Sequence, residues 1–144
     1  IEVTKEIRKI WPKNRILGAK ITGSDHMKNG LSIKDSVRLA KNLKKVGVDY
    51  VSVSSGGIVP VTKMNEQEGF RSKMASIIKK ESKITTTTSG MFTKHSTVVK
   101  LINDKKIDFI TIARIIIKNP RWIYELAKKE KLNSFVPDQY KRIL

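Results

Sequence analysis

The chain of 144 residues is 39% apolar and 30% charged, a balance typical of one globular domain with a hydrophobic core. It has no cysteine and no apolar run of membrane-spanning length, which excludes disulfides, thiolate metal sites, a cysteine nucleophile and a transmembrane helix. The formal net charge of +17 bears on solubility and non-specific binding and says nothing about the fold.

A short β-branched run, a loop and an amphipathic helix follow one another repeatedly along the chain. The first strand is expected over Ile16–Thr22. Ser32, with Asp35 three residues later, predicts the N-cap of the first helix, and Gly47 predicts its end. The apolar residues of this helix recur at helical spacing and are Val37, Ala40, Leu43 and Val46.

The next two units follow the same pattern. The second strand is expected over Tyr50–Ser54, with a long loop over Ser55–Gly69 and a helix over Ser72–Lys80. The third strand is expected over Ile84–Thr88, because its consecutive threonines favour extended structure. After a turn, the apolar residues around Val98 predict another helix.

The fourth unit begins with a strand expected over Phe109–Ile112. Asn119 followed by Pro120 predicts a helix start, with Asn at the cap and Pro at the first helical position. The apolar face of this helix comprises Trp122, Ile123, Leu126 and Ala127. Residues 133–144 show no clear period.

Strands that alternate with helices indicate an α/β fold with a parallel sheet. The expected strand centres lie about 25 to 34 residues apart, close to the roughly 30 residues per unit of a (β/α)8 TIM barrel. We therefore predict half of such a barrel. The alternative is an open doubly wound sheet, but no G-x-G-x-x-G motif follows the first strand.

Functional residues of a parallel barrel gather where the strands end, and phosphate often binds at the loops after the seventh and eighth strands. If the four strands are the last four of eight, these loops carry Gly90 and Arg114. Gly90 lacks a Cβ, which lets the backbone approach a phosphate closely. Arg114 offers a guanidinium fork to phosphate oxygens.

Lys20 is a cation on a strand that is otherwise apolar. A buried cation needs an anionic or electron-rich partner, and the edge of a flavin that gains negative charge on reduction is such a partner. The alternative is a lysine whose ammonium group reaches solvent at the barrel mouth. The alternative for each loop that follows a strand is that its small residues only form a turn.

Six segments carry a recognisable pattern. They are Lys20–Asp25, residues 47–57 with their Ser-Ser-Gly loop, Ser89–Thr93, Asp108–Arg114, Asn119-Pro120 and the tail segment 136–142. In order and spacing they resemble the C-terminal half of the old yellow enzyme family of FMN-dependent barrels. Within this pattern, Lys20 stands where that subclass usually has Arg, Ala113 replaces Gly, and Ser89 replaces an apolar residue.

The resemblance implies that residues 1–144 form the last four βα units of one FMN-binding barrel domain. It implies FMN as cofactor, NAD(P)H as reductant, a small enone-type substrate, a homo-oligomeric whole protein and a cytoplasmic location. Lys20 would lie at the N1/O2 edge of the flavin, Ser55 and Gly56 would flank the cofactor, and the phosphate end would be held by the later loops. The residues of those loops are Gly90, Met91, Ala113 and Arg114.

The residues that act on substrate in this family, a His/His or His/Asn pair and a protonating Tyr, belong to the first four units. We therefore expect the chain to be a fragment that lacks the N-terminal half of the barrel and has no catalytic residue of its own. The absence of Met at Ile1 agrees with this expectation. His26 and His95 match no family position and are interpreted as solvated loop residues.

Two other functions remain open at this point. The net charge alone favours a basic nucleic-acid-binding module, although the lysine pairs are spread along the chain and no recognition motif accompanies them. A non-catalytic half-barrel scaffold would bind no flavin even with the missing half supplied. Of the three, the enzyme fragment is our prediction, with no specific nucleic-acid or membrane partner.

Overall fold

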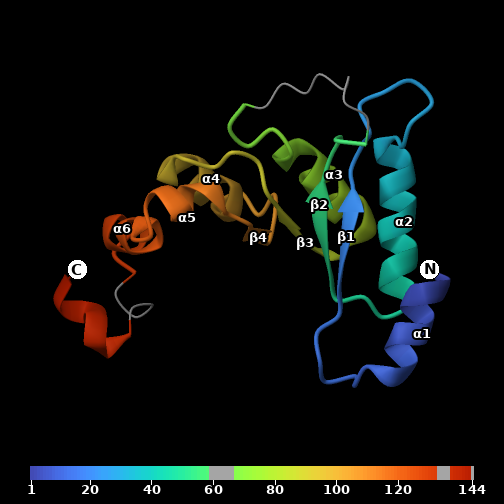
Figure 1. Ribbon diagram of the computed structural model, residues 1–144, viewed down its shortest axis with the longest axis horizontal. Helices are drawn as coiled ribbons and strands as arrows, with labels where there is room; N and C mark the ends of the chain where they lie inside the picture. Colours follow the sequence, from blue (N-terminus) through green and yellow to red (C-terminus); the bar gives the residue numbers. More distant parts are fainter. Residues whose placement is uncertain (59–66, 133–136, 144) are drawn as a thin grey trace.

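The computed structural model describes residues 1–58, 67–132 and 137–143, in which helices and strands alternate (Figure 1). In chain order the elements are α1 (Glu2–Ile10), β1 (Gly18–Thr22), α2 (Ile33–Lys45), β2 (Tyr50–Ser54), α3 (Ser72–Ser82), β3 (Thr85–Thr88), α4 (His95–Asn103), β4 (Phe109–Ile110), α5 (Arg114–Lys118), α6 (Trp122–Lys129) and a 3-10 helix (Asp138–Ile143). The middle of the predicted long loop, 59–66, and the start of the tail, 133–136, lie outside the described residues.

The strands form one parallel sheet in the order β1-β2-β3-β4. In its register, Lys20 lies opposite Ser52, Ser52 opposite Thr87, and Thr87 opposite Phe109. A doubly wound sheet reverses its strand order at a switch point, whereas the strands of a barrel follow one another around it. The sequential order therefore confirms the prediction of part of a (β/α)8 barrel.

The two faces of the sheet differ. On one face, Ile21, Val51 and Val53 are buried in a core that also contains residues of α2 and α3. The other face is open: Phe109 is 61% exposed and borders a hollow of about 660 Å³ that also touches Tyr50 and Thr87. In a complete barrel the helices lie outside and this second face is the packed interior.

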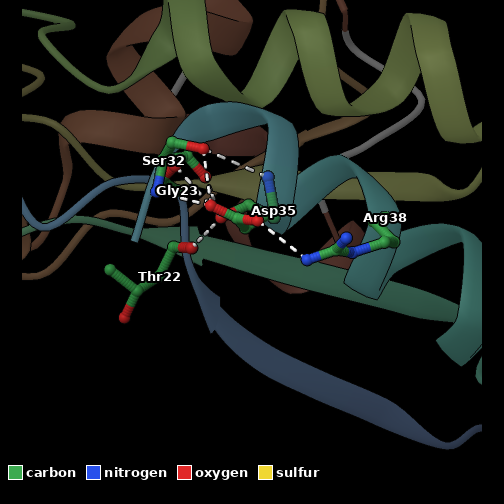
Figure 2. A network of polar contacts seen from close by, with 6 residues as sticks. Thr22, Gly23, Ser32, Asp35 and Arg38 are labelled. Carbon is green, nitrogen blue, oxygen red and sulfur yellow. Dashed lines mark hydrogen bonds and ion pairs between the residues drawn. The ribbon is translucent and has the colours of Figure 1, made fainter. Parts of the chain in front are cut away.

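The start of α2 is fixed by the predicted cap (Figure 2). The Ser32 hydroxyl accepts a hydrogen bond from Asp35 N, and the Asp35 carboxylate accepts one from Ser32 N at 3.1 Å, which completes a capping box. Ser36 Oγ donates to the carbonyl oxygens of Thr22 at 2.6 Å and Gly23 at 3.1 Å. The helix is thereby joined to the end of β1, at the carboxyl edge of the sheet.

The end of α2 also agrees with the sequence. Gly47 has a φ of +88°, a left-handed conformation that glycine adopts without strain. The chain then turns back through a hydrogen bond from Val48 N to Leu43 O at 3.1 Å. The turn brings Asp49 beside the start of β1, where its carboxylate accepts from Leu17 N at 2.7 Å and from Arg8 at 3.3 Å.

Two helices were not predicted. Helix α1 precedes β1 and is held to the sheet through the Arg8–Asp49 ion pair. Helix α5 contains three consecutive isoleucines, a composition that favours extended structure. Its Ile115 and Ile116 nevertheless pack on a second apolar cluster of Phe92, Val98 and Trp122, and this tertiary packing outweighs the local preference.

The ends of some predicted elements differ from those observed. β1 begins at Gly18 instead of Ile16, and β4 ends at Ile110, although Thr111 N still donates to Thr88 O at 2.8 Å. Helix α6 begins at Trp122, two residues later than Pro120. The prediction of Asn119 as its cap is wrong, because the N-cap is Arg121. The Asn119 side-chain oxygen accepts from Arg121 N at 3.0 Å, and the predicted start forms a turn before the helix.

None of the helices in the described part of the chain is long and apolar enough to cross a membrane.

Candidate functional site

A cavity of about 220 Å³ opens at the carboxyl edge of the sheet, between the loops that follow β3 and β4. Four of the residues predicted to hold a phosphate line it: Gly90, Met91, Ala113 and Arg114. The other lining residues are Arg71, Ser89, Phe92, Thr93, Thr111, Ile112 and Ile115. Whole cofactors occupy pockets of roughly 300–1,000 Å³, so this cavity suits the terminal group of a ligand.

Gly90 is fixed by packing against the backbone. A Cβ at this position would lie 3.3 Å from the carbonyl carbon and Cα of Gly69 and 3.4 Å from Phe70 N. Gly69 N donates to Gly90 O at 2.5 Å across the same contact. Packing against the neighbouring loop is therefore a second reason for this glycine, and its role in the close approach of a phosphate stays a prediction.

Arg114 is the first residue of α5 and is exposed. Its guanidinium donates to the thioether sulfur of Met91, which connects the loop after β4 with the loop after β3. Thr111 continues this connection, because its hydroxyl lies 2.8 Å from the hydroxyl of Thr87. Ala113 stands directly before α5, and its carbonyl oxygen accepts from Ile116 N at 3.0 Å.

Arg71 is a site residue that the sequence analysis missed. Its Nε donates to Ser55 Oγ at 3.1 Å, one terminal nitrogen donates to Ser89 Oγ at 3.2 Å, and the other to Ser55 O at 3.4 Å. Its guanidinium also lies 4.3 Å above the centre of the Phe70 ring. One signal was present: Arg71 directly precedes the predicted helix, and helices that follow strands begin at the carboxyl edge.

Ser55 and Gly56 lie at the same edge of the sheet and outside the residues that line the cavity. Ser55 is buried and anchors Arg71. Gly56 has a φ of +60°, and its N–H donates to Ser24 O at 2.9 Å, which joins the loops after β1 and β2. The structure thus connects the loops after β1, β2, β3 and β4 in a continuous series.

Lys20 lies on the open face of the sheet, as the third residue of β1, and is exposed. The interpretation of a buried cation needs correction for this chain, because the face that carries Lys20 has no covering layer among the described residues. The register places it in one row with Ser52 and Thr87. In a complete barrel this row would belong to the interior.

The two histidines differ. His26 is exposed in the loop after β1, as predicted. The prediction of a solvated loop residue is wrong for His95, which is half-buried at the start of α4. Its Nε2 lies 3.2 Å from Trp122 O and its ring centre lies 4.5 Å from the Trp122 ring, so it packs in the second apolar cluster.

Glu68 fixes the start of α4 from the segment before α3. Its carboxylate accepts hydrogen bonds from Lys94 N at 2.8 Å, Thr93 N at 3.3 Å and Thr93 Oγ1 at 2.9 Å. Partial burial acts to raise the pKa of Glu68, but these hydrogen bonds outweigh burial and hold the pKa below its ordinary value of 4.5. Glu68 therefore stays ionised and stabilises the loop that borders the cavity.

The donor set of the cavity fits a phosphate group. Two guanidinium side chains, Arg71 and Arg114, line it together with hydroxyl groups such as that of Ser89, and no carboxylate is among the described lining residues. Guanidinium groups present paired N–H donors in the geometry of phosphate oxygens. Across the described part of the chain, no group of three or more His, Cys, Asp or Glu could hold a metal ion.

A parallel sheet in sequential order, with an arginine-lined cavity in the loops after its last two strands, is the arrangement of the βα-barrel class. Comparison with known proteins specifies the class further. The chain belongs to the NADH:flavin oxidoreductase / NADH oxidase family, whose model matches residues 1–133.

Curated relatives carry names that agree with this family. The chain is 32% identical over 141 residues to an NADPH dehydrogenase of Geobacillus sp. (strain WCH70) and 32% identical over 141 residues to one of Geobacillus thermodenitrificans. It is 26% identical over 142 residues to an NADPH dehydrogenase of Clostridium acetobutylicum. Each match covers 98% of this chain and 41% of the relative, so the chain spans about two-fifths of their length.

Proposed function

We propose that the chain supplies the flavin-binding half of an FMN-dependent NAD(P)H oxidoreductase that reduces small enone-type substrates. The observation that carries this proposal is the arginine-lined cavity between the loops after β3 and β4, in a chain of a flavin oxidoreductase family. We place the reaction in the cytoplasm, where nicotinamide reductants are regenerated.

The position of the cavity supports the last four βα units as the part of the barrel that this chain forms. Phosphate sites of barrels commonly use the loops after strands seven and eight. Here the cavity uses the loops after β3 and β4, the last two strands of the sheet. Counted backwards, β1 would be the fifth strand of the barrel.

When bound, FMN supplies the hydride transfer between NAD(P)H and substrate. Gly90, Met91, Ala113 and Arg114 would hold its phosphate end, through backbone N–H groups and the Arg114 guanidinium. Ser55 and Gly56 would flank the cofactor from the loop after β2. Lys20 would present its ammonium group to the pyrimidine edge of the flavin ring, on the interior face of the barrel.

The chain holds the cofactor in this proposal and leaves substrate chemistry to the first four units. His26 is exposed and His95 packs against Trp122, so neither is assigned a role in the reaction. The interior face around Phe109 is the surface that the first four units would cover. We propose that the whole protein is a homo-oligomer.

The test uses the whole protein encoded by the gene that contains this sequence. It should purify with about one FMN per chain, and NADPH should bleach the flavin under anaerobic conditions and drive reduction of an enone such as 2-cyclohexenone. A whole protein that binds no FMN when reconstituted would contradict the proposal. A protein that binds FMN but transfers no electrons from NADH or NADPH would limit it to flavin binding.

A further inference from the structure

Arg71 has three properties that bear on the binding of an anion. It carries a guanidinium group, it lines the cavity, and that group is oriented by the hydrogen bonds it donates to Ser55 and Ser89. We propose that Arg71 is a second cationic ligand for the phosphate of FMN and determines the preference for FMN over unphosphorylated flavin. The inference rests on the flavin function proposed above.

The orientation of Arg71 is the first step of the argument. Contacts to Ser55 Oγ, Ser55 O and Ser89 Oγ fix the plane of the guanidinium, and the Phe70 ring supports one side of that plane. An arginine side chain normally loses conformational freedom when a ligand immobilises it, and that loss weakens binding. Here the side chain is ordered in advance, so less of the binding free energy is lost.

Charge is the second step. A phosphate monoester carries about −1.5 to −2 charges near pH 7. Arg114 alone supplies one positive charge, from the loop after β4, and Arg71 supplies another from the segment before α3. The cavity thus presents guanidinium groups from two different segments, which can contact different oxygens of one phosphate.

Burial is the third step. Arg114 is exposed, so water and salt screen its interactions, whereas Arg71 is half-buried beneath the loops after β2 and β3. Charge-assisted hydrogen bonds are stronger where the local dielectric constant is lower. Arg71 is therefore expected to contribute to phosphate affinity at least as much as Arg114 does.

The competing explanation is that Arg71 only ties Ser55 to Ser89. The two explanations make different predictions for two ligands that share the isoalloxazine ring and the ribityl chain. Riboflavin lacks the phosphate, so a phosphate ligand affects FMN alone. A residue that only shapes the loops affects FMN and riboflavin alike.

The experiment measures dissociation constants of FMN and riboflavin for the whole protein by quenching of flavin fluorescence, at one ionic strength. We expect R71Q to raise the constant for FMN by about tenfold or more and to leave that for riboflavin within about twofold, because a charge-assisted contact is lost. R38Q is the matched control, since Arg38 is an exposed arginine on α2 that pairs with Asp35. Its constants for both flavins should equal those of the wild type.

Equal weakening of both flavins in R71Q, or no change in either, would overturn the inference. If R71Q does not fold, R71K decides, because it keeps the charge and loses the fork: FMN-specific weakening supports the inference, and uniform or absent weakening overturns it. A wild-type protein that binds neither flavin would instead contradict the proposed function. The two failures are therefore distinguishable.

Discussion

Arg114 and Lys20 lie in different places: Arg114 begins α5, after the last strand, and Lys20 lies on the open face of the first strand. Their removal should therefore affect different properties of a bound flavin. Arg114 lines the cavity that we propose for the phosphate, and the reacting ring would lie away from it. Lys20 lies in the row of side chains that would face the barrel interior.

We predict that Arg114→Ala weakens FMN binding and leaves turnover of the bound flavin nearly unchanged. The loss of one charge-assisted contact costs roughly 1.5–3 kcal/mol of binding free energy. Flavin titration gives the affinity, and NADPH oxidation at saturating FMN gives the turnover. A variant that binds FMN normally but turns over slowly would place Arg114 near the ring and contradict the assignment.

For Lys20→Met we predict the opposite pattern. The reduced flavin carries negative charge at its pyrimidine edge, so loss of the ammonium group should lower the reduction potential while FMN affinity changes little. Potentiometric titration of the bound flavin measures the effect. Lys20→Arg is the control, because it keeps the charge and should keep the potential near that of the wild type.

For individual residues, the sequence identified several that line the cavity, but it did not identify the contacts that hold them in place. Gly90, Met91, Ala113 and Arg114 could be assigned because they follow directly after strands, where barrel sites form. Arg71 and Glu68 could not, because their roles arise from contacts across loops: Arg71 reaches Ser55 and Ser89, and Glu68 reaches the start of α4. No local pattern encodes such a partner.

Among the elements, α4 follows residues that a side chain from another segment holds in place. We predict that Glu68→Gln destabilises the protein by about 1 kcal/mol at pH 7, the usual net contribution of a hydrogen bond. Urea denaturation measures the change. Glu81→Gln is the control, because Glu81 is exposed near the end of α3.

The hydrogen bonds of Glu68 should also give the stability a characteristic dependence on pH. Since the folded pKa of Glu68 is lower than its ordinary value of 4.5, its contribution is fully present above that value and is lost as the pH falls through the folded pKa. The difference in stability between wild type and Glu68→Gln should therefore shrink on acidification. A difference that stays constant down to acid pH would contradict this role for Glu68.

Elements with a strong local signal were predicted closely, and elements that depend on tertiary packing were not. The strand Tyr50–Ser54 has the predicted bounds, and the predicted capping box of α2 forms. Both signals are local in the sequence, the first in the run of strand-forming residues and the second in the chemistry of the cap. Helix α5 was not predicted, because isoleucine favours extended structure. In the fold, packing of Ile115 and Ile116 on the second cluster outweighs that preference. The exposure of Lys20 depends on which other chain segments cover the sheet.

For the whole molecule, the open face and the free edges of the sheet have the largest consequence. β1 and β4 lie at the edges of the described sheet, and Phe109 and Ile16 on or beside the open face are 61% and 73% exposed. Exposed parallel edges recruit other chains. Flavins also need most of their surface buried, which a sheet with one uncovered face cannot provide.

We therefore predict that residues 1–144, produced alone, are colourless with added FMN, self-associate and do not oxidise NAD(P)H. Size-exclusion chromatography, flavin fluorescence and absorbance at the nicotinamide band measure the three properties. The whole protein is the control and should behave in the opposite way for flavin and activity. A yellow, monomeric and active preparation would show that the site lies elsewhere.

The two apolar clusters are nearly separate, one around α2, α3 and the first three strands, the other around α4, α5 and α6 (Figure 1). Among the described residues, Leu101 and Ile110 pack on both. Arg71 directly precedes α3, a helix of the first cluster, and Arg114 begins α5, a helix of the second, so the cavity spans the boundary between them. A bound phosphate would join the two clusters. Amide hydrogens in the second cluster should then exchange more slowly with deuterium when FMN is present, and those around Ile78 should change little.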